Sequence, residues 1–423
     1  MDCLIIKNAT VVDPANSVEE KRDLFVKNGV FVEKASGKQK VIDAKNKFVF
    51  PGFVDIHCHL REPGQTAKET IESGTKAAAA GGFTSILAMP NTKPCVDSAS
   101  TFRLVSEIVK ASAAVKVYLS ACITENREGK KLAPIGTLKN VGAIALTDDG
   151  SCVQNNELML KALEYAKMFN LVVMDHCQDA DMTAKGQMND GLVSLKLGLG
   201  GWPNAAEDII VSRNIILSKY TGARVHMQHL SSAYSVDLVR NAKKMGINVS
   251  AEVTPHHIAL TDESLIDYDT NYKVNPPLRT KEDVKAVIKG LCDGTIDVIA
   301  TDHAPHSLAD KNVEFDYAPC GMIGFETAFS VCYKTLVLSG KMKLSKLIKL
   351  MTISPAKLLG INAGSLQSGM PADFCIADLS RKYVYNKSLS RSKNSPWFGK
   401  ELIGKIEATF VNGKPAYMEQ CGR

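Results

Sequence analysis

Eight short, nearly continuous apolar segments recur along the middle of the chain, and each is followed by a longer stretch of helical periodicity. Strands that are buried on both faces and separated by helices are typical of parallel βα units. Eight such units over roughly 250 residues predict a (β/α)8 barrel. A doubly wound open sheet is the main alternative, but no GxGxxG follows the first segment, which disfavours it. The segments are 52–57, 83–89, 115–122, 141–148, 171–177, 223–230, 247–257 and 296–304.

Both ends of the chain depart from this pattern, because short Val- and Phe-rich runs alternate there with turns. Asn28-Gly29 and Asn412-Gly413 each separate two such runs, which is a strong β-hairpin signal. We therefore expect an α/β protein with two domains. A small β-sandwich domain would be built from residues 1–50 and 361–423, and the barrel would occupy residues 51–360 between them.

Composition and charge exclude several classes of protein. Hydrophobic residues make up 45% of the 423 residues and charged residues 23%, which excludes a disordered or fibrous chain. The net charge of +6 is too small to indicate a nucleic-acid binder, and no apolar run approaches the roughly 20 residues that span a membrane. The basic stretch from Arg381 to Lys393 is interspersed with Ser and Asn and predicts a solvated loop. Eleven dispersed cysteines without a CxxC pair indicate reduced thiols in a cytoplasmic protein.

All nine histidines fall inside the predicted barrel, and each lies at the C-terminal end of a predicted strand or just beyond it. Asp148, Asp149 and Asp302 occupy further strand ends. In a barrel these ends converge on the face that carries active sites. A single histidine at a strand end is usually structural, but nine of nine indicate a functional cluster. The nine are His57, His59, His176, His226, His229, His256, His257, His303 and His306.

His57 and His59 are separated by one residue at the end of the first predicted strand. In an extended strand both imidazoles point to the same side and can reach one ion, whereas Cys58 points the other way and is expected to pack in the core. Imidazole and carboxylate ligands without thiolate suit zinc with an open coordination position. The remaining candidate ligands on the strand ends are His176, His229 and Asp302.

A series of short motifs makes this pattern specific. They are, in chain order, DIHCHLREPG, AMPNT, TDDG, MDHC, HMQHLS, EVTPHH, VNPPLR, ATDHAPH and GMPADF. In the order and spacing of these motifs, the chain resembles the bacterial type I dihydroorotases of the amidohydrolase superfamily over essentially its whole length. HxHxREPG together with ATDHAPH is far more specific than the bare HxH of the superfamily. The resemblance implies a metallo-dependent hydrolase barrel with a split β domain.

The same resemblance implies a zinc centre with one or two ions, two being expected. Asp149 would bridge the pair. Hydantoinases, dihydropyrimidinases and allantoinases use instead a carboxylated lysine on the fourth strand, and the corresponding segment here, VGAIALTD, contains no lysine. This difference favours a dihydroorotase. The implied ligands of the first ion are His57, His59 and Asp302, and those of the second are His176 and His229.

The implied activity is the reversible cyclisation of N-carbamoyl-L-aspartate to L-dihydroorotate with release of water, in pyrimidine (UMP) synthesis. Opening this ring requires a nucleophilic water, a polarised carbonyl and a proton for the leaving nitrogen. Zinc would supply the first two, because it lowers the pKa of a bound water to about 7 and so provides a hydroxide nucleophile. We assign the proton shuttle to Asp302, for which a helix N-cap is the structural alternative.

Substrate and product carry free carboxylates, so the cavity needs fixed hydrogen-bond donors. Arg61, two residues after His59, can offer two parallel N–H groups to a carboxylate. Asn91 and His306 resemble its partners in the family, and His59 would also contact substrate. The structural alternative for Arg61 is an ion pair with Glu62 or another acidic side chain.

The amide edges of the ring would be recognised by Asn275 and by the backbone at Cys320 and Gly321, although Asn275 before two prolines also fits a turn. Residues 307–319 are polar and predict either a mobile lid or an inert connection. His303 has no assigned role. The histidines expected to be structural or to support the ligands are His226, His256 and His257.

Two other functions are compatible with parts of this pattern. A related cyclic amidase would act on hydantoin, dihydropyrimidine or allantoin, but these neutral rings lack the carboxylate that Arg61 and Asn91 would hold. A non-catalytic scaffold that binds aspartate transcarbamoylase would be expected to lose metal ligands, and this chain keeps the full set. We expect a homodimer that binds a small-molecule substrate, with association with aspartate transcarbamoylase left open, and no binding to nucleic acid or membranes.

Overall fold

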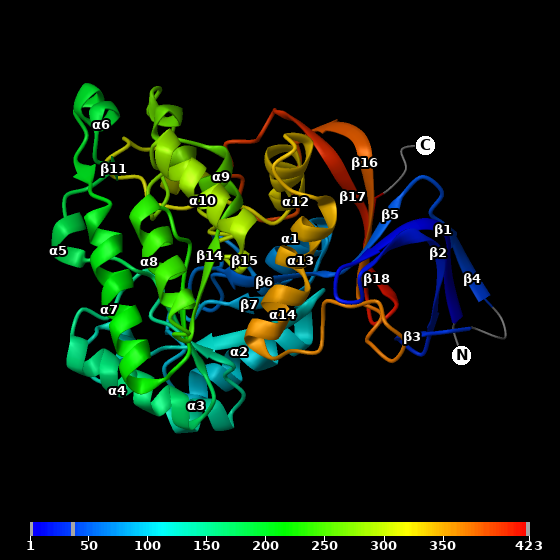
Figure 1. Cartoon of the computed structure of the whole chain (residues 1–423), viewed down its shortest axis with the longest axis horizontal. Helices are drawn as coiled ribbons and strands as arrows, with labels where there is room; N and C mark the ends of the chain where they lie inside the picture. Colours follow the sequence, from blue (N-terminus) through cyan, green and yellow to red (C-terminus); the bar gives the residue numbers. More distant parts are fainter. Residues whose placement is uncertain (1–2, 35–38, 420–423) are drawn as a thin grey trace.

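The computed structural model describes residues 3–34 and 39–419, and at its centre lies an eight-stranded parallel barrel (Figure 1). Each predicted core segment overlaps one strand, and the strands follow one another around the barrel in chain order. The first and last strands meet through a parallel bridge, where the His59 N–H donates to the His303 carbonyl at 2.9 Å. The predicted (β/α)8 barrel is confirmed. Its strands are β6 (Phe53–Cys58), β7 (Phe83–Ala88), β8 (Lys116–Ala121), β9 (Ala145–Leu146), β10 (Val172–Asp175), β13 (Val225–Met227), β14 (Val249–Val253) and β15 (Val298–Ile299).

Helices cover the outside of the barrel, and local sequence sets where several of them begin. Thr70, Ser98 and Asn155 each accept a hydrogen bond from a backbone N–H of the first turn, which satisfies a donor that the helix itself leaves unpaired. The helices are α1 (Ile71–Ala80), α2 (Ala99–Ser112), α3 (Ile135–Asn140), α4 (Asn156–Met168), α7 (Ala205–Thr221), α8 (Ala233–Lys244), α10 (Lys281–Asp293), α12 (Ala328–Cys332), α13 (Leu344–Met351) and α14 (Ile353–Leu359).

Several predicted strands are longer than the observed ones, and one of them runs into a helix. Residues 247–257 were expected to be extended, but β14 ends at Val253 and α9 (Pro255–Ala259) follows at once. Thr254 accepts from the His257 N–H at 3.3 Å, and proline at the first helical position is already in a helical conformation. Other short elements near the mouth are α5 (Ala180–Thr183), β11 (Met188–Asn189), α6 (Leu192–Leu197), β12 (Gly201–Trp202) and α11 (Leu308–Lys311).

The two chain ends form one sheet beside the barrel, with its first strands blue and its last strands orange to red in Figure 1. All eight strands are joined by hydrogen bonds into a single sheet, where the sequence suggested a sandwich. The ends meet directly, because β5 pairs antiparallel with β16. The strands are β1 (Cys3–Asp13), β2 (Val18–Lys27), β3 (Val30–Val32), β4 (Gln39–Asp43), β5 (Phe48–Pro51), β16 (Phe374–Val384), β17 (Glu401–Val411) and β18 (Lys414–Met418).

Both predicted hairpin turns are confirmed, between β2 and β3 and between β17 and β18. At each turn the Asn and the Gly both have positive φ, 53° and 80° at Asn28-Gly29 and 48° and 71° at Asn412-Gly413. Positive φ at both central residues is what a two-residue hairpin of type I′ requires. The two turns pack together, since a Cβ added to Gly29 would lie 3.0 Å from the Asn412 carbonyl oxygen.

The segment between β16 and β17 contradicts the expectation of a solvated loop. Within residues 385–399, which we call the strap, exposed and buried positions alternate over 389–394, and residues 395–397 are buried as well. Ser390, Ser392 and Asn394 are buried, whereas Arg391 and Lys393 point to water. The basic residues suggested a solvated segment only because they occupy the outer face of an extended chain, whose side chains alternate between two sides.

Membrane-spanning helices and cysteine pairing can be checked in the described residues. No helix within residues 3–34 and 39–419 is long and apolar enough to cross a membrane. Ten cysteines belong to this part of the chain, and all of them are free thiols. Cys58 is buried, and its thiol donates to the Leu87 carbonyl at 3.2 Å, so it packs in the core as expected.

Candidate active site

The C-terminal ends of the barrel strands surround a cavity of about 190 Å³. Nearly all of the predicted site residues line it, although they come from segments that are far apart in the sequence. His57 alone of this set lies beneath the cavity floor, fully buried. The predicted residues that line the cavity are His59, Arg61, Asn91, Asp149, His176, His229, Asn275, Asp302, His306, Cys320 and Gly321.

The first group of candidate ligands is formed by His57, His59 and Asp302. Asp302 Oδ1 lies 3.0 Å from His59 Nε2 and 3.5 Å from His57 Nε2. A zinc ion lies about 2.0–2.1 Å from each nitrogen ligand, so two ligand atoms of one ion are at most about 4 Å apart. Both distances from Asp302 satisfy this limit, and the ligand atoms of the three side chains lie within 4.8 Å of one another, so they form one of the clusters able to hold a metal ion.

The second group is formed by His176 and His229, with Asp149 between it and the first. His176 Nδ1 faces His229 Nε2 at 2.8 Å. Asp149 Oδ1 lies 3.8 Å from His176 Nδ1 and 3.1 Å from His57 Nε2, and Asp149 Oδ2 lies 3.5 Å from His59 Nε2. Burial alone would raise the pKa of Asp149, but the surrounding imidazoles, His57 first, hold it well below its usual range. This carboxylate therefore remains ionised between the two groups.

A buried glutamate that the sequence analysis missed orients the first group. Glu252, on β14, lies 2.6 Å from His57 Nδ1 and 3.1 Å from His226 Nε2. Burial opposes its ionisation, but the nearby imidazoles of His57 and His226 and the hydrogen bonds from them lower its pKa to about 2. Because a carboxylate only accepts, it fixes the proton of His57 on Nδ1 and leaves Nε2 free to bind a metal. An acidic residue in the otherwise apolar strand of the EVTPHH motif was the available signal.

The donor chemistry of this cluster fits a bound cation. His57 Nε2 is buried and has no hydrogen-bond partner among the described residues, although two carboxylates lie within 3.5 Å. Buried ring nitrogens normally have partners, so an unpartnered one that faces carboxylates is explained by a missing ligand. His176 fits equally well: its Nε2–H donates to Gln178 Oε1 at 2.7 Å, which leaves Nδ1 free toward His229.

Three site residues have strained backbones. Arg61, His229 and Asp302 have φ of 58°, 32° and 46°, in the region that side chains other than glycine rarely adopt. Such conformations cost about 1–3 kcal/mol each and persist only where the surrounding structure imposes them, often at active sites. The N-cap alternative for Asp302 is wrong, because the next helix, α11, is capped by Ser307.

His306 lines the cavity and has three cations close to it, Arg61, Lys68 and Lys311. We call these four residues the basic wall. The His306 Nε2–H donates to the Cys320 carbonyl at 2.9 Å, while Lys68 Nζ lies 3.3 Å from Nδ1. Burial and the charges of Arg61, Lys311 and Lys68 lower the pKa of His306 to about 2, so its imidazole is neutral. No motif pointed to Lys68.

The guanidinium of Arg61 is held in place by a backbone carbonyl and forms no ion pair with another described residue. Its Nε donates to the Pro305 carbonyl at 3.1 Å, and its Nη2 lies 3.3 Å from His306 Nε2. The alternative of a pair with Glu62 is wrong, because Glu62 instead accepts from the Ile71 N–H at the start of α1. Arg61 has no ion-pair partner among the described residues, so its charge remains available to an anion in the cavity.

Two asparagines connect the cavity to the ligand groups. Asn91 Oδ1 accepts from His59 Nδ1 at 3.0 Å, and its Nδ2 lies 3.4 Å from Asp149 Oδ2. Asn275 Nδ2 donates at 2.9 Å to Gln178 Oε1, the same oxygen that holds His176. Both side-chain amides therefore line the cavity and also contact the candidate metal ligands, Asn91 directly and Asn275 through Gln178.

The remaining histidines have structural partners. His226 binds Ser250 and Glu252, and His257 Nε2 donates to the Pro276 carbonyl at 2.9 Å. His256 contacts His257 with ring centroids 4.5 Å apart and the ring planes tilted by 47°, while its Nε2 is buried without a hydrogen-bond partner among the described residues. His303, which the sequence left unassigned, accepts from the Gly324 N–H and stacks on Phe325. None of these four lines the cavity.

Two lysines, Lys311 within the segment 307–319 and Lys273 outside it, tie this segment to residues 270–273. Lys311 Nζ donates to the carbonyls of Thr270 and Pro319 at 2.9 and 2.7 Å, and Lys273 Nζ donates to the Phe315 carbonyl at 2.7 Å. A lid motion would have to break the bonds to Thr270 and from Lys273. Proteolysis of this segment with and without substrate therefore remains the test of the lid hypothesis.

Comparisons with known proteins agree with this geometry. Residues 46–235 match the family model described as Dihydro-orotase-like. The chain is 47% identical over 423 residues to the dihydroorotase of Acetivibrio thermocellus, with 99% of both chains covered. It is 46% identical over 416 residues to the dihydroorotase of Elusimicrobium minutum, covering 97% of this chain and 96% of the other.

Among solved structures, the L-hydantoinase (dihydropyrimidinase) of Arthrobacter aurescens has a TM-score of 0.88 at 25% identity, covering 98% of this chain and 96% of that one. A dihydropyrimidinase from Brevibacillus agri has a TM-score of 0.86 at 22% identity, covering 99% of this chain and 95% of that one, which shows the shared fold. Identity to dihydroorotases is about twice as high and extends along nearly the whole chain. The chain is a cyclic amidohydrolase and belongs to the dihydroorotase family.

Proposed function

We propose that this protein is a zinc-dependent dihydroorotase that interconverts N-carbamoyl-L-aspartate and L-dihydroorotate plus water in pyrimidine synthesis. One observation carries the proposal: two groups of imidazole and carboxylate ligands face a basic wall across a cavity of about 190 Å³. Metal ligands suit amide chemistry, and the basic wall suits a substrate with free carboxylates.

The ligand geometry supports two ions with Asp149 between them. Its Oδ1 lies within about 4 Å of a ring nitrogen from each group, the largest separation that one zinc ion can span. When bound, zinc would polarise the amide carbonyl and make a water acidic enough to attack near neutral pH. The proposed ligands are His57, His59 and Asp302 for one ion, His176 and His229 for the other, and Asp149 for both.

Asp302 is the proposed proton shuttle. Its carboxylate lines the cavity, while its Oδ1 faces the imidazoles of His57 and His59. A carboxylate at this boundary can take a proton from the attacking water and deliver it to the ring nitrogen that leaves. In the cyclisation direction, the same carboxylate accepts the proton of the attacking nitrogen.

The cavity wall orients the substrate. The guanidinium of Arg61, with Asn91 and His306, would hold the carboxylate that remains free in both substrate and product. Asn275 and the backbone at Cys320 and Gly321 would contact the amide edges of the ring. These groups line the same cavity as the candidate ligands, so they can hold the substrate with its reacting carbonyl toward the ligand groups.

The test is a substrate panel combined with metal analysis. We expect turnover of dihydroorotate, one to two zinc ions per chain, loss of activity on chelation and recovery on addition of zinc. Hydantoin and dihydrouracil serve as controls, because they share the cyclic amide and lack the carboxylate. Turnover of hydantoin without turnover of dihydroorotate would contradict the substrate assignment, and full activity in metal-free protein would contradict the zinc assignment.

We extend the proposal to assembly and organisation. The chain would act in the cytoplasm as a homodimer, with aspartate transcarbamoylase as a candidate partner, and light scattering of the purified protein alone and with that enzyme tests both. The division into 1–50, 51–360 and 361–423 is supported by the end of β5 at Pro51 and by the start of β16 at Phe374.

A further inference from the structure

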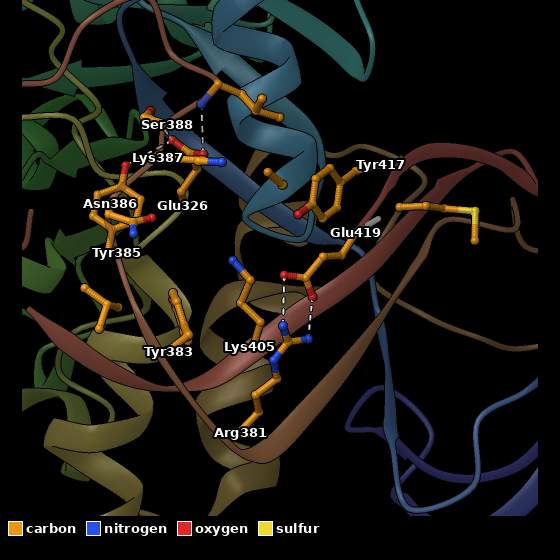
Figure 2. Close-up of a pocket in the computed structure, with 14 residues that line it drawn as sticks. Glu326, Arg381, Tyr383, Tyr385, Asn386, Lys387, Ser388, Lys405, Tyr417 and Glu419 are labelled. Atoms are coloured by element: carbon orange, nitrogen blue, oxygen red, sulfur yellow. Dashed lines mark hydrogen bonds and ion pairs between the residues drawn. The ribbon is translucent and has the colours of Figure 1, made fainter. Parts of the chain in front are cut away.

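The strap crosses from the terminal sheet to the mouth of the barrel. At its start, Tyr385 Oη donates to Glu326 Oε2 at 3.0 Å, and the Leu389 N–H donates to Glu326 Oε1 at 3.0 Å. Figure 2 shows this attachment, with Glu326 reaching toward Ser388 beside a cavity of about 550 Å³. Further along, Ser392 Oγ donates to the Lys68 carbonyl at 2.6 Å, so the strap reaches the basic wall.

Asn394 is the strap residue that bonds to residues lining the candidate substrate cavity. Its Nδ2 donates to the carbonyls of Ala304 and Gly321, both at 3.0 Å, and its Oδ1 accepts from the His306 N–H at 3.0 Å. Its own carbonyl accepts from the Ile323 N–H at 2.9 Å. The side chain is only 4% exposed, and each of its polar atoms is used.

These bonds join two separate stretches of the cavity wall. Ala304 and His306 follow β15 directly, whereas Gly321 lies beyond the segment 307–319. Asn394 does not line the cavity itself, since it borders a neighbouring one of about 350 Å³ on the far side of His306. From outside the cavity, Asn394 therefore holds these two stretches of the cavity wall together.

We infer that Asn394 is a positioning residue for substrate, which keeps His306 and the backbone at Gly321 at the spacing that the ring and its carboxylate require. This inference rests on the proposed function, because it takes these wall residues as the substrate contacts. Removing the amide leaves two buried carbonyls and one N–H without partners, and buried polar groups without partners are costly. The wall would relax to satisfy them, while the ligand groups across the cavity, which Asn394 does not touch, would keep their arrangement.

The experiment compares Asn394→Ala and Asn394→Asp with wild type in dihydroorotate hydrolysis, metal content and thermal unfolding. We expect the KM of Asn394→Ala to rise roughly 5- to 50-fold, with kcat within about threefold and unchanged zinc content, because the variant loses binding that is shared by ground and transition states. Asn394→Asp keeps the acceptor for the His306 N–H but faces two carbonyls. Its KM should fall toward the wild-type value as pH decreases, because a protonated carboxyl can donate to one carbonyl.

Tyr385→Phe is the matched control. It also removes one buried hydrogen bond from the strap, but at Glu326, away from the cavity wall, and it should lower the unfolding temperature without changing KM. A wild-type KM in Asn394→Ala, or equal changes in Asn394→Ala and Tyr385→Phe, would overturn the inference.

The controls also separate this inference from the proposed function. If Asn394→Ala does not fold, the pH dependence of KM in Asn394→Asp tests the inference instead. A KM that approaches the wild-type value at low pH supports it, and a KM that does not approach this value overturns it. If wild type turns over another cyclic amide and not dihydroorotate, the proposed function fails, and the same KM comparison on that substrate still tests Asn394.

Discussion

The barrel mouth and the terminal sheet differ in how far their charged side chains are buried. At the mouth, His57 Nε2 lies 3.1 Å from Asp149 and 3.5 Å from Asp302, and all three side chains are buried. In the sheet, Lys47 pairs with Asp378 at 2.6 Å and Glu407 at 2.9 Å, and these side chains keep contact with water.

This difference separates two roles. A partly exposed ion pair adds about 0–1 kcal/mol, whereas a buried charge that loses its partner costs about 3–5 kcal/mol. A dense cluster of buried charges is therefore retained for a reason other than stability. At the mouth the reason that we propose is metal binding and proton transfer, whereas the sheet obtains its stability from apolar packing and uses its charges as a minor supplement.

Asp302→Asn tests the mouth and has the largest expected effect. The amide keeps the shape and one possible ligand oxygen but cannot accept the proton, so we expect turnover to fall by about 10²–10⁴-fold. Circular dichroism should show a folded protein. Asp283→Asn is the control, because this buried carboxylate caps α10 away from the cavity and should affect stability without affecting turnover. Near wild-type turnover in Asp302→Asn would remove this residue from the mechanism.

Phe374→Ala tests the sheet. Phe374 is fully buried and stacks on Phe410 with ring centroids 4.5 Å apart, so its removal should lower the free energy of unfolding by about 3–5 kcal/mol. KM and kcat measured well below the unfolding temperature should not change. Val384→Ala on the same strand is the control, since Val384 is 51% exposed and should shift stability by less than about 0.5 kcal/mol. A lower kcat in folded Phe374→Ala would break the separation between the two regions.

Asp378→Asn tests the charges of the sheet and has the smallest expected effect. Burial opposes ionisation, but hydrogen bonds from Lys47 and Ser380 lower the pKa of Asp378 to about 2, below about 3.9 in the unfolded chain. Its stabilisation is therefore present above about pH 4 and is lost as pH falls toward about 2. We expect a loss of about 1 kcal/mol at pH 7 that shrinks from pH 5 to pH 3 in urea unfolding.

The control for this prediction is Glu401→Gln. Glu401 pairs with Lys382 at 3.0 Å, but both side chains are about 60% exposed, so almost no change in stability is expected. An equal loss in the two variants, or a loss in Asp378→Asn that does not depend on pH, would show that the charge of Asp378 is not what stabilises this part of the sheet.

Sequence patterns predicted the residues whose chemistry is visible in their own type and position. HxH on β6 and the acidic residues after the other strands could be placed together because parallel barrel strands end on one face. Glu252 was missed because a single acidic residue in a strand does not show which imidazoles it faces. Lys68 and Asn394 were missed because their contacts join segments far apart in the chain, and Asn394 donates to Gly321 across 73 residues.

The sequence by itself determined the barrel, the hairpins at both ends and the family, because apolar periodicity, Asn-Gly turns and strand-end histidines are local signals. The tertiary structure alone decided how charge is distributed around the cavity and what the strap does. The basic stretch from Arg381 to Lys393 looks solvated in sequence, yet Ser390 and Ser392 within it are buried. Burial and hydrogen-bond partners are properties of the packed chain, and no local pattern contains them.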